Sequence, residues 1–473
     1  MGKLGTQQAP LRVAIVGSGP SGFYAAGHLL RPKSHPDLVA QVDVYDRLPT
    51  PWGLVRGGVA PDHPNIKAVS RVYEKTAAHP EFRFFGNVEY GAEVTHEDLL
   101  ERYHAVIYAV GAQTDRRLGI PGEDLPGSWA ATEFVAWYNG HPDFRHPEFD
   151  LSCERAVVIG NGNVAADVAR MLALTRDELA VTDVADHALE VMAESKIREI
   201  VVLGRRGPAQ AAFTNPELLE LGAMTDADVF VDSRDVALDP LSQTWLEGDG
   251  ASSTARKNVE ILSGYAGREP TGKRRRIVLR FLVSPVEILG SERVEGIRIC
   301  RNELRAEDGT IRACATETTE ELDCGIVFRS IGYRGIPLAG LPFDERACTI
   351  PNRGGRITGE DGEALPGEYV VGWIKRGPTG IIGTNKRDAQ ESVDALLADL
   401  DADALNRPAD PDREALETLL DERKPDHVTY TGWEAIDVAE KTAGEPHGRP
   451  RVKLTSLDEL LEAASEGEPA ARS

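Results

Sequence analysis

The stretch "VVIGNGNVAADVARML" (residues 157–172) has the pattern of a dinucleotide-binding turn. A run of apolar residues predicts a buried strand, and Gly160, Gly162 and Ala165 then fit G-x-G-x-x-A at the start of a helical stretch. A similar pattern stands near the beginning of the chain, in "LRVAIVGSGPSGFYAAGHLL" (residues 11–30). The sequence therefore predicts two nucleotide-binding loops, roughly 140 residues apart.

The first loop carries the three glycines Gly17, Gly19 and Gly22 of a G-x-G-x-x-G pattern. Gly17 permits a tight turn, Gly19 lets a pyrophosphate approach the backbone, and Gly22 allows the helix to pack closely. The pyrophosphate is expected at the positive end of that helix. Asp46 ends the next predicted strand, where a carboxylate can accept a hydrogen bond from a ribose hydroxyl. Strand, helix and acid together favour a cofactor site over a merely structural turn.

The second loop is followed by a strand that ends in "LGRRG", so that Arg205 and Arg206 stand where the first unit has an acid. An NAD ribose requires a carboxylate at this place, whereas the 2′-phosphate of NADP requires cationic donors. A solvated arginine pair is the structural alternative. The two loops together predict FAD in the first and NADP(H) in the second, brought together for hydride transfer.

Charge and cysteine content exclude several classes of protein. The formal net charge of -23 disfavours nucleic acid and anionic membranes as partners. The five cysteines are scattered and form no C-x-x-C pair, which argues against a redox-active disulfide, a zinc ribbon and a cluster-binding segment. We therefore predict no metal site and expect electrons to travel on a bound organic cofactor.

Length and hydropathy patterning indicate a multidomain protein without a membrane span. At 473 residues the chain exceeds one ordinary domain, and no apolar run approaches the roughly 20 residues that a bilayer requires. The opening "MGKLGTQQAP" leads directly into the first predicted strand, so we expect neither a secretory nor a transit segment and a cytoplasmic location.

The order of the predicted elements suggests one domain inserted into another. Continuous Val/Ile runs favour parallel sheets with both faces covered. Residues 173–198 look like a long helical insertion, and the period-two pattern from residue 272 to 304 suggests antiparallel strands. The predicted fold is α/β with two Rossmann-like domains. The FAD domain comprises 1–112 and 336–473, the latter with a C-terminal helical extension, and 113–335 form the inserted NADP domain.

Five long motifs resemble one family. They are "VAIVGSGPSGFYAAGHLL", "VDVYDRLPTPWGLVRGGVAPDHP", "VVIGNGNVAADVAR", "VLGRRGPAQAAFTNPEL" and "VVGWIKRGPTGIIGTNKRDA". They resemble the adrenodoxin reductase family of ferredoxin–NADP reductases from about residue 11 to 400, and the match is nearer to bacterial, mycobacterial-type members than to mitochondrial ones.

The resemblance implies a set of site residues. FAD contacts are implied for Ser21, Asp46, Leu54 and Tyr90, although the family often has Glu at the position of Asp46. The NADP loop is implied at Asn161, Gly162, Asn163 and Val164, with contacts to the phosphate and the nicotinamide side from Arg205, Arg206 and Glu217. The segment along the isoalloxazine is implied to hold Trp373, Gly380, Ile381 and Ile382.

The resemblance implies that three residues act at the nicotinamide: His63 and Glu217 as a pair beside the ring, and Gly380 by approaching it. The implied role of Gly380 also has a physical reason, because a glycine has no side chain to hold two stacked rings apart. The helix that follows "KRGPTGIIGTN" can stabilise negative charge on a reduced flavin through its N-terminus.

The function implied by the resemblance is hydride transfer from NADPH to FAD, followed by single-electron transfers to a ferredoxin-type iron–sulfur protein, with a cytochrome P450 as one eventual consumer. The alternatives are a glutamate-synthase-type flavoprotein subunit, which normally carries N-terminal cysteines absent here, and a non-catalytic nucleotide sensor. Ferredoxins are usually acidic, so transient docking is expected on a basic cluster, and a monomer is favoured. The candidate clusters are Lys273–Arg276, Arg280, Lys375/Arg376 and Lys386/Arg387.

Overall fold

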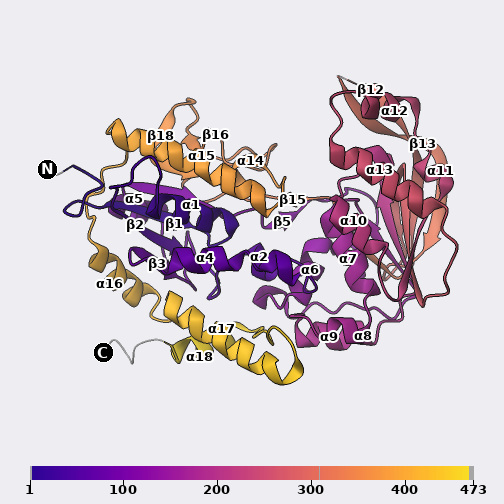
Figure 1. The fold of residues 1–473 in the computed structure, drawn as a ribbon, viewed down its shortest axis with the longest axis horizontal. Helices are drawn as coiled ribbons and strands as arrows, with labels where there is room; N and C mark the ends of the chain where they lie inside the picture. Colours follow the sequence, from indigo (N-terminus) through magenta and orange to yellow (C-terminus); the bar gives the residue numbers. More distant parts are fainter. Residues whose placement is uncertain (1–2, 308, 468–473) are drawn as a thin grey trace. The chain divides into compact units, whose positions relative to one another are not determined.

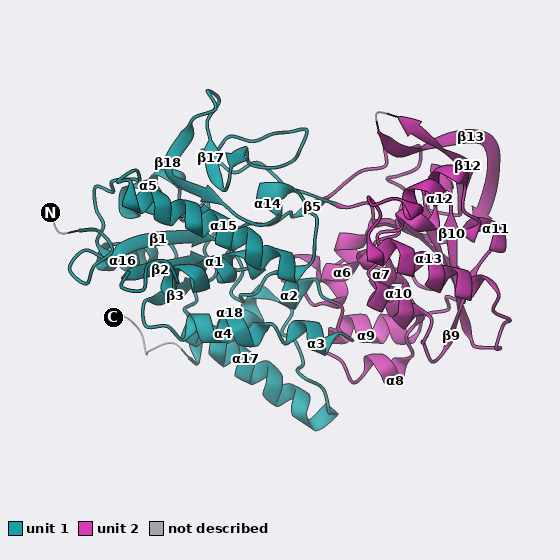
Figure 2. Ribbon diagram, turned by 45° about the horizontal axis from the view of Figure 1, so that its top comes forward, with its two compact units in different colours: residues 1–59, 63–114, 333–473 teal, residues 60–62, 115–332 magenta. Residues whose placement is uncertain are grey.

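The computed structural model describes residues 3–307 and 309–467, which fall into two compact units (Figure 2). Unit 1 comprises Met1–Val59, His63–Thr114 and Tyr333–Ser473. Unit 2 comprises Ala60–Asp62 and Asp115–Gly332, so it is inserted into unit 1 in chain order. Two short strands, β5 (Thr114–Asp115) and β15 (Tyr333–Arg334), pair where the chain passes between the units.

Unit 1 is built on a seven-stranded sheet of order β16-β17-β18-β4-β1-β2-β3 (Figure 1). Its strands are β1 (Leu11–Val16), β2 (Ala40–Tyr45), β3 (Phe82–Phe85), β4 (Ala105–Tyr108), β16 (Asn352–Arg353), β17 (Arg356–Thr358) and β18 (Ala364–Val370). Strands β18, β4, β1, β2 and β3 run parallel, and every residue of β1 is buried. Burial on both faces explains the continuous apolar runs of the sequence.

Helices cover this sheet, and the C-terminal helices belong to the same unit. The helices are α1 (Pro20–Leu30), α2 (Leu54–Gly57), α3 (Pro64–Lys67), α4 (Ser70–Ala77), α5 (His96–Arg102), α14 (Trp373–Arg376), α15 (Ile382–Asp401), α16 (Arg413–Arg423), α17 (Tyr430–Gly444), η3 (Glu445–His447) and α18 (Leu457–Ser465). Helices α1 and α15 pack side by side. Trp433 of α17 is buried in the core shared with β1 and β2 and lies edge-on to Trp52, with ring centroids 4.9 Å apart.

Unit 2 is built on a six-stranded parallel sheet of order β6-β14-β7-β8-β10-β9. These strands are β6 (Ser128–Ala130), β7 (Arg155–Ile159), β8 (Glu199–Gly204), β9 (Ala227–Val231), β10 (Arg275–Phe281) and β14 (Ile326–Arg329). A separate antiparallel sheet holds β11 (Val283–Leu289), β12 (Gly296–Glu307) and β13 (Thr310–Asp323). The two parallel sheets confirm the predicted α/β fold with two Rossmann-like units.

The prediction of antiparallel strands between residues 272 and 304 is confirmed for β11 and β12. It is wrong for β10, which is parallel to both of its neighbours. Its residues alternate between buried and more exposed because one face is only partly covered, and this produced the period-two pattern. Residues 173–198 form two short helices instead of a long one. The helices of unit 2 are α6 (Ala131–Tyr138), η1 (Pro142–Phe144), α7 (Asn163–Ala173), α8 (Arg176–Leu179), α9 (Asp186–Ala193), η2 (Pro208–Gln210), α10 (Asn215–Leu221), α11 (Ser233–Val236), α12 (Pro240–Glu247) and α13 (Ser253–Ala266).

Each glycine loop leaves the carboxyl end of a central strand. β1 lies between β4 and β2, and β7 lies between β14 and β8, so the strand order reverses at β1 and at β7. In parallel α/β sheets such a reversal opens a crevice at the carboxyl edge, where ligands bind. The fold thus places one candidate nucleotide site in each unit.

Candidate functional site

The glycines of the first loop are required by the backbone. Gly17 follows β1 with φ +105°, and a Cβ there would lie 2.6 Å from the carbonyl oxygen of Ala109. A Cβ on Gly22 would lie 2.1 Å from the carbonyl oxygen of Gly17. Around Gly19 the nearest atom lies 4.0 Å away, the Cα of Gly53. The turn therefore leaves open backbone at Gly19, the position expected to face a pyrophosphate.

Asp46 holds this loop in place. Its Oδ2 accepts hydrogen bonds from the backbone N–H (2.9 Å) and the hydroxyl (2.5 Å) of Ser18, and its Oδ1 accepts from the N–H of Leu48 (3.0 Å). Sequence reasoning assigned Asp46 only to a ribose and missed this role. A carboxylate has about four acceptor sites, so capacity for a ribose hydroxyl remains.

Two further predicted FAD residues lie on other parts of unit 1. Leu54 begins α2 after Trp52 (φ +83°) and Gly53 (φ +49°), and this apolar residue is 39% exposed. The hydroxyl of Tyr90 donates to the carbonyl oxygen of Ala339 (2.6 Å), so this group is already engaged. The aromatic ring of Tyr90, and not its hydroxyl, is therefore the part available to contact a cofactor.

The segment between β18 and α15 contains the third predicted group. Trp373 begins the one-turn helix α14, and its ring lies 5.1 Å from that of Tyr333. Ile381 has 61% of its surface exposed, and Ile382 begins α15. Gly380 has φ +83°, and a Cβ there would lie 2.6 Å from Oγ1 of Thr384. Gly380 is therefore needed by the backbone itself, and a larger residue would strain the loop whether or not a nicotinamide stacks there.

The residues of unit 1 fit an FAD. The indole nitrogens of Trp52 and Trp373 are buried donors that have no hydrogen-bond partner among the described residues. Leu54 and Ile381 add exposed apolar surface against which a ring can pack. A flavin offers a large apolar ring with polar edges, and the glycine loop offers open backbone for its pyrophosphate.

The second loop is pinned to a neighbouring segment of unit 2. Gly160 has φ +133°, and a Cβ there would lie 2.0 Å from the carbonyl oxygen of Ser330. The carbonyl oxygen of Asn161 accepts from the N–H of Ala212 (3.0 Å), and Oδ1 of Asn163 accepts from the N–H of Thr214 (2.8 Å). Val164 and the fully buried Ala165 lie in the first turn of α7, and Gly162 is its N-cap. The loop is thus held rigidly at the carboxyl end of β7.

Arg205 and Arg206 follow β8, the neighbour of β7 in the sheet. Arg205 is exposed, and its carbonyl oxygen accepts from the side-chain amide of Asn302 (2.8 Å). Arg206 is half-buried, and burial, together with the charge of Arg205, lowers the pKa of its guanidinium. No carboxylate of the described residues forms an ion pair with either arginine. Two such cations beside a nucleotide loop suit a phosphate dianion.

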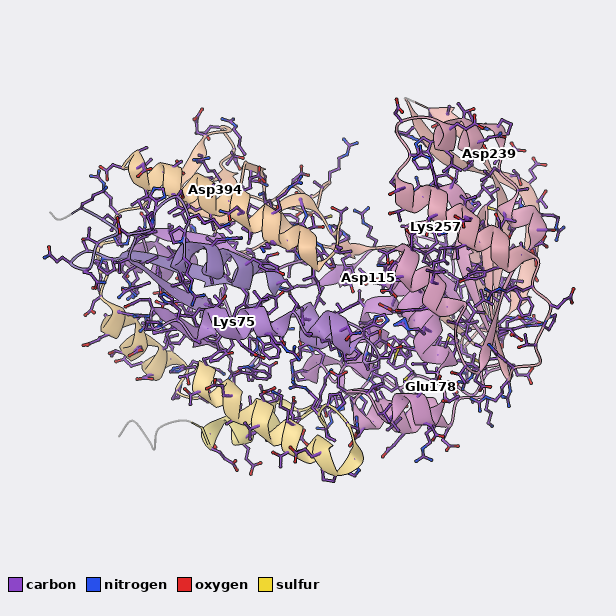
Figure 3. The ribbon with its side chains drawn as sticks, in the orientation of Figure 1. Lys75, Asp115, Glu178, Asp239, Lys257 and Asp394 are labelled. Carbon is purple, nitrogen blue, oxygen red and sulfur yellow. The ribbon has the colours of Figure 1, made fainter. Side chains whose placement is uncertain are left out.

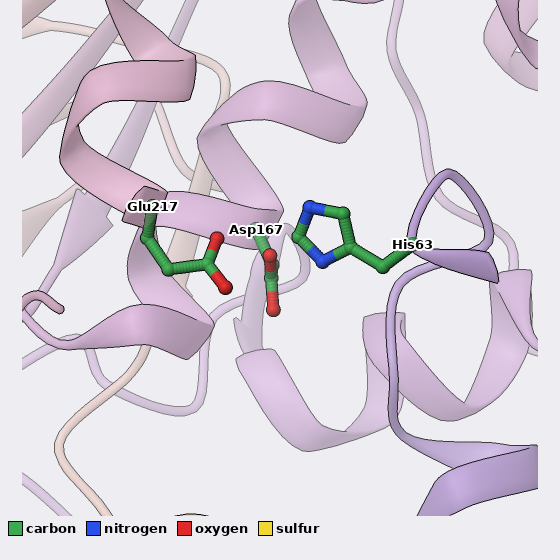
Figure 4. A group of neighbouring side chains, drawn as sticks. All are labelled: His63, Asp167 and Glu217. Atoms are coloured by element: carbon green, nitrogen blue, oxygen red, sulfur yellow. The ribbon is translucent and has the colours of Figure 1, made fainter. Parts of the chain in front are cut away.

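Glu217 lies in a buried charge cluster that sequence reasoning missed. Asp167 on α7 and Glu217 on α10 approach to within 4.8 Å through their carboxylate oxygens (Figure 4). The guanidinium of Arg170 lies 2.7 Å from Asp62, 2.7 Å from Asp167 and 3.6 Å from Glu217. Burial raises the pKa of Asp167 to about 8, and the nearby carboxylates reinforce the rise against the opposing charge of Arg170.

This cluster has more carboxylates than cations, so at neutral pH it can hold a proton. The only signal in the sequence was the i, i+3 spacing of Asp167 and Arg170. His63, the other predicted nicotinamide-side residue, directly follows Asp62 in the chain and caps α3.

Comparisons with known proteins relate the chain to NADPH-dependent oxidoreductases. Residues 11–202 match the family model "Pyridine nucleotide-disulphide oxidoreductase". The chain is 54% identical over 460 residues to "NADPH-ferredoxin reductase FprA" of Mycobacterium tuberculosis, covering 96% of this chain and 98% of the relative. It is 41% identical to "NADPH:adrenodoxin oxidoreductase, mitochondrial" of Arabidopsis thaliana, covering 96% of each. The solved structure "Mycobacterium tuberculosis FprA in complex with NADPH" matches with TM-score 0.90 and 53% identity, over 96% of this chain and all of that one.

The two relatives, each covered over at least 96% of its length, define the broad class, an NADPH-dependent oxidoreductase. At this identity and coverage, the chain belongs to the adrenodoxin reductase family of NADPH–ferredoxin reductases. This family assignment favours the ferredoxin reductase over the alternative of a glutamate-synthase-type flavoprotein subunit.

Proposed function

We propose that this protein binds FAD in unit 1 and NADPH in unit 2, takes hydride from NADPH and passes single electrons to an acidic ferredoxin. The observation that carries the proposal is the contrast between the loops: Asp46 serves the first, and the unpaired Arg205 and Arg206 stand beside the second. Bound FAD supplies the step from two-electron to one-electron chemistry.

The residues of both units bind and orient the two cofactors. In unit 2, the loop from Gly160 to Asn163 binds the pyrophosphate of the coenzyme, and Arg205 and Arg206 bind its 2′-phosphate. In unit 1, Ile381 provides apolar surface to orient the flavin ring and exclude water.

The buried carboxylates of unit 2 hold a proton near the nicotinamide side of the loop. Asp167 is suited to this because its pKa of about 8 leaves the carboxyl group protonated at neutral pH. Glu217 lies on the same cluster, 8% exposed, where the resemblance places it beside the nicotinamide. Hydride leaves NADPH without any proton, so the task of this pair is to orient the nicotinamide and to keep the negative charge beside it low.

Lys386 and Arg387 are the best candidates for docking a ferredoxin. Both are exposed on the first turns of α15, directly after the segment expected to carry the flavin, and no carboxylate of the described residues pairs with them. Their charges can attract an acidic partner to the place from which electrons must leave.

The other cationic clusters suit docking less well. Lys375 is 7% exposed and Arg376 19% exposed, both beside Asp388, and Arg280 pairs with Glu320. Residues 273–276 precede or begin β10, at the amino edge of the sheet, about 20 Å along the strands from the nucleotide loop. They line a cleft of about 930 Å³ whose walls hold seven cations and five carboxylates, so its field is weak.

Charge reversal tests this docking surface. The variant Lys386→Glu/Arg387→Glu should slow ferredoxin reduction and flatten its dependence on ionic strength, while reduction of ferricyanide stays at the wild-type rate. Arg274→Glu/Arg276→Glu is the matched control at the amino edge of unit 2 and should change neither rate. Equal loss with both acceptors would rule out a docking role for α15.

The sensor alternative makes a different prediction, because a sensor would bind NADPH without rapid bleaching of its flavin.

For the described residues, no helix is both long and apolar enough to cross a membrane.

A further inference from the structure

Asp388 is a buried carboxylate on α15 that the proposed chemistry does not use. Its side chain is 7% exposed. Asp388 is among the buried residues of α15. Asp394 on the same helix, labelled in Figure 3, is exposed. A buried carboxylate is costly unless it is paired and hydrogen-bonded, so its partners indicate what it is for.

Among the described residues, the Asp388 carboxylate has three partners, and all of them belong to one short segment, Gly372–Arg376. Oδ2 accepts the backbone N–H of Gly372 at 2.5 Å and lies 3.2 Å from Nη1 of Arg376. Oδ1 lies 3.2 Å from Nζ of Lys375. The segment contains only the single turn of α14, between Gly372 (φ +78°) and Gly377 (φ +82°). One helical turn has little stability of its own, so these contacts fix its position.

This segment connects the first glycine loop with the expected flavin surface. A Cβ on Gly372 would lie 2.3 Å from Oγ of Ser21, which places the segment against the start of α1. The next residue is Trp373, whose indole nitrogen lacks a partner among the described residues. A displacement at Gly372 would therefore change both the phosphate loop and the indole.

Asp388 also balances charge beside that surface. Lys375 has a second carboxylate, Glu391, at 2.9 Å, but Glu391 is 59% exposed and therefore screened by solvent. Arg376 bonds otherwise to neutral acceptors, the side chain of Asn385 (2.7 Å) and the carbonyl oxygen of Thr379 (3.2 Å). Loss of the Asp388 charge would leave two poorly exposed cations without a buried counterion.

We propose that Asp388 is a positioning residue that fixes Gly372–Arg376 against the Ser21 turn and neutralises Lys375 and Arg376, thereby setting the orientation and the reduction potential of the flavin. The proposal rests on the function proposed above, because it takes the flavin to lie along residues 373–382. Uncompensated positive charge favours the reduced, more negative flavin, so Asp388 holds the potential low enough for electrons to pass to ferredoxin.

The test compares two Asp→Asn variants on the same helix. Asp388→Asn should retain FAD, alter its absorption bands, raise its midpoint potential measured against a reference dye, and slow ferredoxin reduction. Asp399→Asn is the matched control, because Asp399 pairs with Arg356 (2.7 Å) and accepts from Tyr369 (2.6 Å). It should lower the melting temperature but leave the absorption bands and the potential unchanged. An unchanged potential in Asp388→Asn, or equal shifts in both variants, would overturn the proposal.

Two more variants keep the outcome interpretable. Lys375→Met removes one cation and should move the potential in the opposite direction, which gives a test if Asp388→Asn does not fold. Ile381→Trp should change the flavin absorption bands if the flavin lies on this segment. If Ile381→Trp alters the bands and Asp388→Asn alters nothing, the role of Asp388 is refuted while the flavin site stands. If neither alters the bands, the placement of the flavin is wrong and both proposals fail.

Discussion

Replacement of Arg205 and Arg206 by Ala should remove the preference for NADPH over NADH. The two residues follow β8, one strand from the glycine loop, and no described carboxylate neutralises them. Arg206 is half-buried, and burial and the neighbouring charge lower its pKa, so a phosphate dianion would relieve repulsion between the two cations. NADH lacks the 2′-phosphate and cannot use these donors.

The magnitude follows from the two contacts. A hydrogen bond to a charged group contributes about 1.5–3 kcal/mol. Arg205 is exposed and screened, so its contribution belongs at the lower end, and that of the half-buried Arg206 belongs higher. A total of at least about 3 kcal/mol corresponds to on the order of a hundred-fold in affinity, at about 1.4 kcal/mol per decade. Arg206→Ala should accordingly cost more than Arg205→Ala.

The assay is initial-rate kinetics with both coenzymes on the wild type, the single variants and the double variant. The KM for NADPH should rise by on the order of a hundred-fold in the double variant, whereas the KM for NADH should stay nearly constant. Arg305→Ala/Arg312→Ala, two exposed arginines of β12 and β13 in the same unit, is the control and should change neither value. A parallel loss with NADH would show that Arg205 and Arg206 support the fold and do not recognise the phosphate.

Three further predictions concern carboxylates that are partly or fully buried. Asp46→Ala frees Ser18 and should weaken FAD binding about tenfold or more in equilibrium dialysis, and unchanged affinity would refute its role in the loop. Asp167 has a folded-state pKa of about 8, above its ordinary 3.8, so its stabilising contribution is complete below about pH 4 and is lost as the pH rises to about 8. Asp167→Asn should therefore flatten the fall in melting temperature between about pH 5 and pH 8, whereas an unaltered slope would contradict the raised pKa. Glu440 is fully buried and binds Arg56 and Arg451, so Glu440→Gln should lower the free energy of unfolding by about 3–5 kcal/mol in urea titration, and a cost below about 1 kcal/mol would refute the pairing.

The two glycine loops could be predicted because each depends on a local pattern of strand, turn and helix. The arginine pair could be predicted because parallel strands carry their functional residues to the same edge. The cluster around Arg170 could not be predicted, because its residues come from three separate segments, residues 60–62, α7 and α10. No local sequence pattern indicates that these segments lie side by side in the fold. Asp388 was missed for the same reason, since it acts on a segment that precedes it in the chain. Strand β10 was misjudged because partial covering of a parallel strand imitates the alternation of an antiparallel one.

Anaerobic spectroscopy of the purified protein tests the central claim most directly. The oxidised protein should show flavin absorption bands, one equivalent of NADPH should bleach them, and oxidised ferredoxin should then restore them while about two equivalents of ferredoxin become reduced per flavin, since FAD stores two electrons and ferredoxin accepts one. A protein that binds NADPH without bleaching, or that bleaches but never reduces ferredoxin, would contradict the proposed route of electrons from NADPH through FAD to ferredoxin.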